Sequence, residues 1–306
     1  MNCYCTIITA NYFFYAKALF DSLAQFQPNA SFKVLVVDAK NKELAYNGID
    51  VVSLIEIKES FPDDYTKIAH YESDPESNLR WALKPIFLKY LLLSEKFDKV
   101  LFLDPDLFFY NDPSFLFEKL VSSDVILTPH WRSKDPEFDQ ANFESLFTGG
   151  LFNAGFFGCN KNAINILDWW LKVCAYKMVK EGGFYVDQAY LNLMPIYFTE
   201  QVEVIQHKGC NISNWNMIEC QRSLVKDDVI IDKKFPLIFI HFTNATINFI
   251  AFGKDAILKP HLRIYKETLL NHNASFKFNY EIKTISQEKK KPNLLSKLIH
   301  KRKKNE

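Results

Sequence analysis

Short apolar runs alternate with helical patterns at the start of the chain. Residues 4–9 form an apolar run typical of a strand, and the run stops at Ala10-Asn11. Residues 13–26 carry apolar side chains at helical spacing, and residues 32–37 form a second strand-like run. A strand, a helix and a strand in this order predict the opening of a parallel sheet.

The alternation continues to about residue 255 and predicts one α/β domain over residues 1–255. Residues 58–80 favour a loop with a short helix, and residues 131–146 favour an irregular loop. A helical segment over 256–288 and a basic amphipathic tail over 289–306 should follow. Further strands are expected at residues 51–55, 99–103 (which 108–110 would extend beyond the turn), 125–128, 202–205 and 237–242, and helices at 82–93, 114–121, 163–180 and 187–193. Residues 151–159 are apolar and contain glycine.

The composition excludes several classes of protein. Of 306 residues, 48% are hydrophobic and 24% are charged, which is the balance of a globular chain rather than a disordered one. The net charge of +1 argues against a uniformly basic protein, so we expect no nucleic-acid partner. No apolar run approaches the roughly 18 residues of a membrane-spanning helix, and the first residues lack the features of a signal peptide.

The six cysteines and the missing signal peptide favour a cytoplasmic location. None of the cysteines forms a C-x-x-C pair, so a zinc ribbon is not expected. A chain of this length needs no disulfides, and we expect reduced thiols in a cytosolic protein.

Charge is distributed unevenly between the body and the tail. Residues 289–306 contain eight basic residues and one acidic residue, which leaves residues 1–288 mildly acidic. In a helix, Leu294, Leu295, Leu298 and Ile299 would share one face with lysines around it. Such a segment predicts peripheral attachment to an anionic membrane surface, at the inner face of the cytoplasmic membrane. The alternative is a solubilising, disordered terminus or a non-specific polyanion binder.

Asp104-Pro105-Asp106 follows the expected strand at residues 99–103. Two carboxylates at i and i+2 of an extended backbone point to the same side, and the proline favours an extended Asp104. Carboxylate oxygens suit Mg²⁺ or Mn²⁺, and the carboxyl end of a strand is where α/β proteins bind ligands. The motif therefore predicts a divalent metal that holds a diphosphate. The alternative is a strand-ending turn with solvated acids.

Several segments in one collinear order resemble glycosyltransferase family 8, which includes glycogenin and bacterial lipopolysaccharide α-galactosyltransferases. The match runs from about residue 4 to residue 243, and it resembles a bacterial surface-polysaccharide branch more than glycogenin. The segments that carry it are Thr9-Ala-Asn-Tyr12, Phe102-Leu-Asp-Pro-Asp106, Leu151-Phe-Asn-Ala-Gly155, Asp187-Gln-Ala-Tyr-Leu-Asn192 and Ile240-His241-Phe242, with Leu127-Thr-Pro-His130 and Cys210-Asn-Ile-Ser-Asn-Trp-Asn216.

The resemblance implies a GT-A (Rossmann-like) fold, with a mixed, mostly parallel central sheet flanked by helices and a helical C-terminal extension. It implies Mn²⁺ or Mg²⁺ bound by Asp104, Asp106 and His241, and catalytic roles beside the reacting centre for Gln188 and Asp187. It further implies a nucleotide-sugar site; the residues that match this site are Thr9, Ala10, Asn11, Lys84, Asp104, Asn153, Ala154 and Gly155.

The implied activity is metal-dependent transfer of a hexose from a nucleotide-diphosphate sugar, UDP-sugar being favoured, to a glycan or lipid-linked acceptor, with retention at the anomeric carbon. Two alternatives are a catalytically dead nucleotide-sugar-binding protein and a sugar nucleotidyltransferase. The second is disfavoured because residues 9–15 lack the glycine of a phosphate loop.

Single residues also have structural explanations. His241 could be a core histidine, Lys84 a surface lysine and Trp215 a core residue rather than a sugar platform. Asn153–Gly155 could be only a tight turn, and Asp187-Gln188 only the start of a helix. Two features differ from the family pattern: His241 is followed by Phe-Thr-Asn-Ala-Thr instead of G-x-x-K-P-W, and Ala189 replaces the second acid of D-Q-D.

Overall fold

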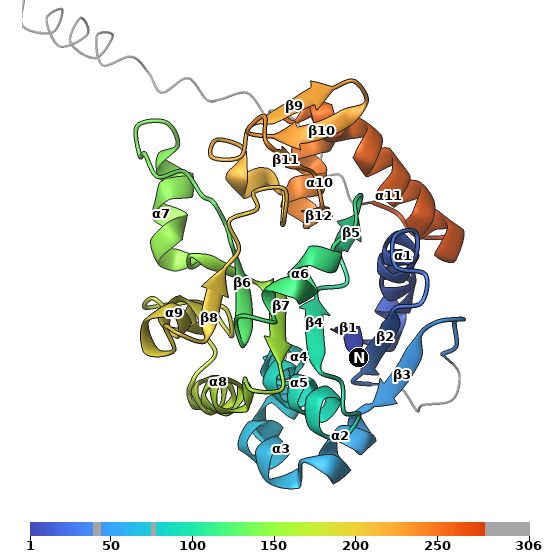
Figure 1. Ribbon diagram of the computed structural model, residues 1–306, viewed down its shortest axis with the longest axis vertical. Coiled ribbons are helices and arrows are strands. Elements are labelled where there is room, and N and C mark those ends of the chain that lie inside the picture. Colours follow the sequence, from blue (N-terminus) through green and yellow to red (C-terminus); the bar gives the residue numbers. More distant parts are fainter. Residues whose placement is uncertain (39–43, 75–77, 279–306) are drawn as a thin grey trace, which may run out of the picture. The chain divides into compact units, whose positions relative to one another are not determined.

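A central seven-stranded sheet organises the chain (Figure 1). The computed structural model describes residues 1–38, 44–74 and 78–278, and Met1–Phe276 form one compact unit separate from Lys277–Glu306. The sheet order is β3-β2-β1-β4-β7-β6-β8. Its strands are β1 (Asn2–Ile8), β2 (Ser31–Val36), β3 (Asp50–Ser53), β4 (Lys99–Leu103), β6 (Val125–Pro129), β7 (Phe152–Asn160) and β8 (Val202–Val204).

Six strands of this sheet run in one direction and β7 runs against them. β1 pairs in parallel with β2 and β4, whereas β7 is antiparallel to both β4 and β6. The expected mixed, mostly parallel sheet flanked by helices is thus confirmed. Since β1 and β4 are parallel neighbours, the segments after them emerge at the same edge of the sheet, which is where α/β folds bind ligands.

Apolar side chains alternate between two cores, one on each face of the sheet. Along β4, Val100 and Phe102 enter one core while Leu101 and Leu103 enter the other. Helices α5 and α8 pack together over the first face, and α1 covers the second. The α-helices are α1 (Phe13–Ala24), α2 (Leu54–Ser60), α3 (Pro62–Ile68), α4 (Asn78–Ala82), α5 (Lys84–Leu93), α6 (Ser114–Lys119), α7 (Gln140–Thr148), α8 (Ile164–Tyr176), α9 (Met194–Tyr197), α10 (Asn244–Ala251) and α11 (Lys259–His272).

Two small sheets complete the site edge. β5 (Leu107–Phe109) pairs antiparallel with β12 (Phe239–His241), which carries His241 back to the aspartates. β9 (Arg222–Val225), β10 (Asp228–Ile231) and β11 (Phe235–Pro236) form the other sheet. β5 is therefore a strand of a second sheet rather than a continuation of β4.

Several expected boundaries need correction. The expected strand at 51–55 ends at Ser53, because Ser53 and Glu56 form a capping box that starts α2. The loop expected at 131–146 contains the start of α7, capped by the Asp139 side chain. The helix expected from residue 187 begins only at Ala189, as the 3-10 turn Ala189–Leu193.

The C-terminal segments extend the compact unit. Helix α11 packs against α1, so Lys259–His272 belongs to the unit that contains the sheet. The expected basic tail at 289–306 lies outside the described residues. All six cysteines are buried and free of disulfides. Within the described ranges, no helix has the length and apolar character needed to cross a membrane.

Candidate active site

The two aspartates after β4 lie in a tight turn. Leu107 N–H donates to the Asp104 carbonyl (3.1 Å), and Asp104 N–H donates to the Gly155 carbonyl on β7 (2.7 Å). The carboxylates are therefore brought together by a turn, and the expected extended pleat through Asp106 is wrong. Phe242 N–H donates to the Asp106 carbonyl (2.8 Å), which ties the turn to the end of β12.

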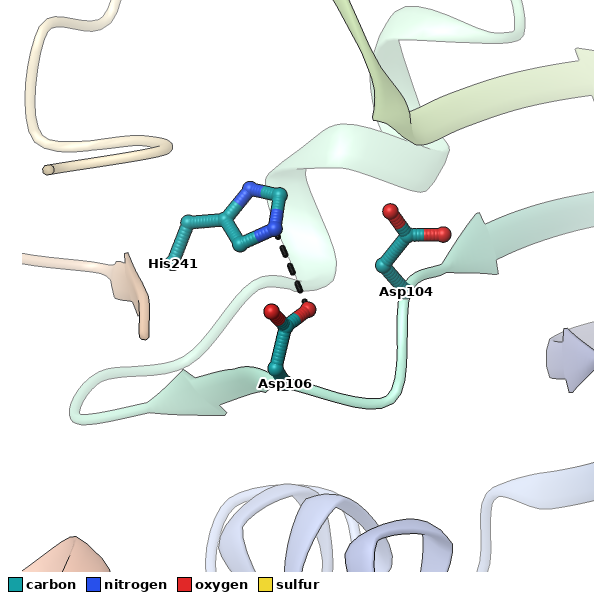
Figure 2. Close-up of side chains that lie close together, drawn as sticks. All are labelled: Asp104, Asp106 and His241. Atoms are coloured by element: carbon teal, nitrogen blue, oxygen red, sulfur yellow. Dashed lines mark ion pairs between the residues drawn. The ribbon is translucent and has the colours of Figure 1, made fainter. Parts of the chain in front are cut away.

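His241 approaches this turn from β12 (Figure 2). One ligand atom each from Asp104, Asp106 and His241 all lie within 4.8 Å of one another, and His241 Nε2 is 3.1 Å from Asp106 Oδ1. On its other side, His241 Nδ1 lies 3.2 Å from Asn211 Oδ1, and Asn211 Nδ2 donates to Thr128 Oγ1 (3.1 Å). Because Asn211 donates through Nδ2, its Oδ1 faces His241 as an acceptor. This arrangement favours the His241 tautomer with hydrogen on Nδ1 and a lone pair on Nε2.

The donor set fits a divalent metal. Two carboxylates and an imidazole are ligands for Mn²⁺ or Mg²⁺, with imidazole more at home on Mn²⁺. Gly155 leaves the space beside them open: a Cβ there would lie 2.6 Å from His241 Cε1 and 2.7 Å from Asp104 Oδ2. The residues that the sequence predicted as metal ligands thus do converge, and only glycine at position 155 allows their approach.

Lys84 is buried beneath the aspartates rather than solvated. Its Nζ donates to the Ala154 carbonyl (2.8 Å), lies 2.9 Å from Asp187 Oδ2 and 3.7 Å from Asp104 Oδ1. Burial opposes its charge, but Asp104 and Asp187 outweigh burial, so the pKa of Lys84 is raised. The structural alternative of a surface lysine is therefore wrong.

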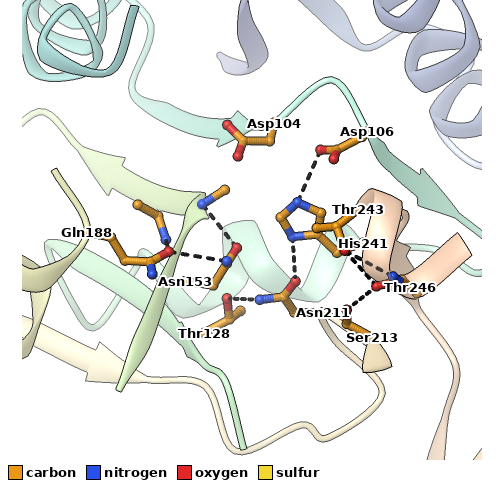
Figure 3. A network of polar contacts seen from close by, with 12 residues as sticks. Asp104, Asp106, Thr128, Asn153, Gln188, Asn211, Ser213, His241, Thr243 and Thr246 are labelled. Carbon is orange, nitrogen blue, oxygen red and sulfur yellow. Dashed lines mark hydrogen bonds and ion pairs between the residues drawn. The ribbon is translucent and has the colours of Figure 1, made fainter. Parts of the chain in front are cut away.

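Asn153 and Gln188 form a hydrogen-bonded network next to the metal ligands (Figure 3). Gln188 Oε1 accepts from Ala154 N–H (3.0 Å) and Asn153 Nδ2 (3.3 Å), while Gln188 Nε2 donates to the Gly149 carbonyl (2.6 Å). Asn153 Oδ1 accepts from Gly155 N–H (3.0 Å). Both amides therefore hold the backbone of β7 in place at the site.

Asp187 precedes this network and is held by strained backbone. Val186 has a φ of 42°, a left-handed conformation that β-branched residues rarely adopt. Trp170 Nε1 donates to the Asp187 carbonyl (3.1 Å). Burial raises the pKa of Asp187, and the charge and hydrogen bond of Lys84 oppose this shift.

The metal-ligand groups influence one another's protonation. Burial raises the pKa of Asp104, against the charge of Lys84. Burial would also raise the pKa of Asp106, but the charge and hydrogen bond of His241 outweigh it and lower this pKa. Burial disfavours the charged form of His241, yet Asp106 outweighs burial and raises the pKa of His241.

These groups line a cavity of about 530 Å³. Of the residues predicted from the sequence, Lys84, Asp104, Asp106, Asn153, Ala154, Gly155, Asp187, Gln188 and His241 line it. Thr9, Ala10 and Asn11 do not; they follow β1 at the same sheet edge, where Thr9 Oγ1 donates to Asn11 Oδ1 (2.6 Å) and Ala10 N–H to Asp38 Oδ1 (2.7 Å). The part of the nucleotide-sugar site that these three residues were predicted to form therefore lies outside the cavity lining.

Sequence reasoning assigned no role to two buried residues that organise the site. Arg222 donates to the Ser213 carbonyl (2.6 Å) and to Asn216 Oδ1 (2.8 Å), and its Nε is 3.1 Å from Asp255 Oδ2. This ion pair holds the loop that carries Asn211 beside His241. In the sequence, only the Cys210–Asn216 segment pointed to this part of the site. Nothing in the sequence linked that segment to residues 222 and 255.

Trp215 is buried, as the core alternative expects, and it also lines the cavity. Its ring makes edge-to-face contacts with His241 and with His130, at centroid distances of 5.4 and 5.2 Å. His130 Nδ1 lies 2.9 Å from the Gly150 carbonyl, and burial, together with the charge of Arg132, lowers the pKa of His130 to about 3. A neutral His130 therefore supports both Trp215 and the Asn153 amide.

Comparisons with known proteins agree with this geometry. Two proteins of Bacillus subtilis (strain 168), both described as uncharacterized, are similar over most of their length. YfnF is 28% identical over 80% of this chain and 82% of its own, and YfnD is 29% identical over 79% and 77%.

Solved structures share the fold. An active-site mutant of LgtC superposes with a TM-score of 0.52 at 16% identity, over 88% of this chain and 95% of that one. The bifunctional glycosyltransferase WbbM gives 0.51 at 15% identity, over 88% of this chain and 49% of that one. The model of the family described as glycosyl transferase family 8 matches residues 3–246. The GT-A-like fold is thereby confirmed, and the chain belongs to glycosyl transferase family 8.

Proposed function

We propose that this glycosyltransferase moves a hexose from a UDP-sugar to a glycan or lipid-linked saccharide acceptor in surface polysaccharide synthesis. Membership of the family makes it an enzyme that uses a nucleotide-sugar donor and retains the anomeric configuration. The observation that carries the finer proposal is the convergence of Asp104, Asp106 and His241 on a cavity that Lys84 and Gln188 also line.

Asp104, Asp106 and His241 would hold Mn²⁺ or Mg²⁺. When bound, the ion supplies Lewis-acid stabilisation of the charge that develops on the departing diphosphate. Asn211 keeps the His241 ring oriented for this, and the charge of Lys84 opposes the rise that burial causes in the pKa of Asp104. The site is therefore organised before the donor binds, which is how electrostatic catalysis avoids reorganisation during the reaction.

The roles of Asp187 and Gln188 follow from their contacts. Asp187 lies 2.9 Å from the ammonium of Lys84, and only 2% of it is exposed, so it makes a poor nucleophile. Gln188 joins Gly149 to Ala154 and presents its amide at the cavity wall. This supports a front-face displacement in which no enzyme carboxylate attacks the sugar, with Gln188 stabilising charge at the reacting centre.

Thr9, Ala10 and Asn11 are proposed to bind the base and ribose. They follow β1, whose carboxyl end lies beside that of β4, and this edge is the usual ligand position in α/β folds. Asn153, Ala154 and Gly155 would contact the donor sugar from β7. A donor extended along the sheet edge would then bring its diphosphate to the aspartates.

A donor-hydrolysis panel tests the proposal. The full chain is incubated with Mn²⁺ and each of several UDP-, GDP- and ADP-sugars, and release of the nucleoside diphosphate is measured. Release from a UDP-hexose that stops on chelation supports the proposal. Binding without hydrolysis or transfer would instead favour a catalytically inactive nucleotide-sugar-binding protein, and release of pyrophosphate from a nucleoside triphosphate and a sugar phosphate would favour a nucleotidyltransferase.

Residues 289–306 are proposed to bind an anionic membrane surface where a lipid-linked acceptor is held. Each basic residue near such a surface contributes on the order of 1 kcal/mol, and salt weakens the attraction. The full chain should sediment with anionic vesicles at low salt, whereas a chain ending at Gln287 should not, yet should still hydrolyse donor. Equal sedimentation of both chains would remove the membrane role.

A further inference from the structure

Arg132 lines the same cavity from the loop after β6. Its Nη1 donates to Asn142 Oδ1 on α7 (3.0 Å), and Asn142 Nδ2 in turn donates to the Trp215 carbonyl (2.8 Å). The guanidinium is thus attached by one nitrogen to a bridge between α7 and the loop that carries Trp215. Its position is set by the protein before any substrate arrives.

The other side of this guanidinium has no partner within the described ranges. Arg132 Nε is fully buried and donates to no acceptor, and no carboxylate of the described residues forms an ion pair with the guanidinium. No bond of Nη2 to a described residue is present either. Nε is closed to solvent, so Nη2 is the nitrogen that a group in the cavity can reach. A guanidinium N–H donates strongly to the oxygens of a carboxylate or a phosphate.

The charges near Arg132 do not compensate for the burial of its guanidinium. Burial lowers the pKa of Arg132, and Tyr185 and Asp139 only partly oppose the shift. Asp139 is occupied in capping α7, where its side chain accepts from Asn142 N–H (3.1 Å). In contrast, the buried Lys84 has two carboxylates nearby.

Backbone strain fixes the direction of Arg132. Trp131, directly before it, has a φ of 50°, a left-handed conformation that is unfavourable for a bulky residue. The Trp131 ring is covered by Lys208 Nζ at 5.2 Å from its centroid. The fold therefore maintains an unfavourable conformation that directs an unpaired cation toward the cavity.

The adjoining wall combines aromatic rings with a second cation. Trp81, Lys180 and Tyr185 all line the cavity, and Lys180 Nζ lies 5.2 Å from the Trp81 ring centre and 5.9 Å from that of Tyr185. Aromatic rings suit the apolar face of a sugar, and cations suit its acidic substituent. No ion pair of Lys180 with a described carboxylate is present either.

We propose that Arg132 is the centre of a subsite for an anionic group, a carboxylate or a phosphate, on one of the two sugars that react. The inference rests on the proposed function and deepens it by assigning a charge to the substrate. The group could belong to the transferred sugar, as in a hexuronate donor, or to the acceptor saccharide. Lys180 assists from the adjoining wall, and the ordinary metal-bound diphosphate is not the group in question.

Two binding experiments separate these sources. In the donor arm, the full chain with Mn²⁺ is titrated with UDP-glucose and with UDP-glucuronate. In the acceptor arm, the chain saturated with UDP and Mn²⁺ is titrated with glucose and with glucose 6-phosphate. We expect the anionic probe to bind at least about tenfold more tightly than its neutral partner in one arm, because a hydrogen bond between charged groups is worth that much.

Variants assign the preference to Arg132. Arg132→Met should abolish the preference, and Arg132→Lys, which keeps the charge but loses the planar guanidinium, should retain only part of it. Lys134→Met is the matched control: it makes the same charge change two residues away, at a side chain that is 85% exposed, and should leave the preference intact. Thermal unfolding of each variant confirms that the chains compared are folded.

The outcomes distinguish the anionic subsite from the proposed function. If no UDP-sugar and no UDP bind in the presence of Mn²⁺, the proposed function fails. If UDP-sugars bind but neither arm prefers the anionic probe, or if Arg132→Met retains the preference, the anionic subsite is overturned while the proposed function stands. In that case Arg132 serves only to join α7 to the Trp215 loop.

Discussion

Two parts of the cavity wall, the metal end with Lys84 and His241 and the Arg132 end, treat buried charge in opposite ways. At the metal end, Lys84 lies between Asp104 and Asp187, and His241 between Asp106 and Asn211. At the Arg132 end, Nε and Nη2 of the guanidinium have no partner among the described residues. Buried charges are normally paired, so an unpaired one in a cavity wall indicates a partner that comes from outside.

This difference separates groups that organise the site from groups that select its substrate. Pairing at the metal end places Lys84 beside two carboxylates and orients the imidazole, which prepares the site for a cation and a diphosphate. Pairing at the Arg132 end would consume the donors that a substrate needs. Changes at the metal end should therefore abolish turnover or stability, whereas changes at the Arg132 end should alter selectivity.

The largest effect should come from the metal ligands. Asp106→Asn removes one carboxylate from the three-ligand set and should lower Mn²⁺-dependent donor hydrolysis by more than about a hundredfold, since even indirect partners of a metal are worth roughly 10–100-fold. The fold should survive, because Asp106 lies in a turn at the end of β4. Steady-state hydrolysis and thermal unfolding measure the two effects.

The control for Asp106→Asn is Asp227→Asn, the same chemical change in the exposed turn between β9 and β10. It should leave hydrolysis unchanged. If wild-type turnover persists in chelated buffer, or if Asp106→Asn keeps near-normal turnover, the assignment of a metal to the cavity is wrong.

Lys84→Met should produce the largest loss of stability. It leaves Asp104 and Asp187 without their buried counter-charge, which typically costs about 3–5 kcal/mol in free energy of unfolding. Lys89→Met provides a comparison on the same helix: Lys89 pairs with Asp64 and Asp168, but the Asp168 side chain is 53% exposed. Chemical denaturation should show a clearly smaller loss for Lys89→Met; equal losses would mean that the charges of the metal end are not specially enclosed.

Gly155→Ala should weaken metal binding without removing any ligand. The added Cβ would overlap His241 Cε1 and Asp104 Oδ2, so both groups must move. We expect a loss of roughly 10–100-fold in Mn²⁺ affinity, measured by titration calorimetry. Gly158→Ala, on the same strand, would clash with Ile126 and Leu101 in the core instead. It should lower stability but not the metal affinity of the folded protein, and a similar affinity loss in both variants would attribute the effect to β7 as a whole.

Sequence patterns predicted the strands of the fold better than the turns that connect them. The strand Lys99–Leu103 was located to the residue, because five strand-forming positions end at an Asp-Pro break. The same pattern misjudged the next three residues, since a turn at Asp104 depends on a hydrogen bond to the distant Gly155. Helix α7 was missed because residues 131–146 are mostly polar, although Phe143, Leu146 and Phe147 do recur at helical spacing.

The residues of the active site show the same contrast between those that sequence patterns identify and those that they miss. Asp104, Asp106, His241, Asn153 and Gln188 were identifiable because family motifs mark them, and the structure brings all of them to one cavity. The residues that position them were not identifiable. Arg222 and Asp255 lie 33 positions apart, and the importance of Arg132 depends on the absence of a counter-charge among the described residues, which no sequence pattern displays.

Gln188→Ala tests a residue that connects the metal end with the Arg132 end. Gln188 contacts β7 and also Gly149, and Arg132 lies beside Gly149. We expect kcat to fall by roughly 10–100-fold with a smaller change in donor KM, as for a group that acts on transition-state charge. Gln206→Ala, at an exposed glutamine, is the matched control. A changed KM with an intact kcat would assign Gln188 to donor binding instead.

The smallest effect should be the pH dependence of the metal-free chain. Asp106 raises the pKa of His241 above its ordinary value, so the stabilisation from this pair is complete below that ordinary value and is lost as pH rises through the raised pKa. Asp104 adds to the shift and Lys84 opposes it. Comparison of wild type with His241→Gln by chemical denaturation should show a stability difference that shrinks as pH rises. A difference that grows with pH would mean that His241 is neutral in the folded chain, and the Asp106–His241 contact would then be a hydrogen bond without charge.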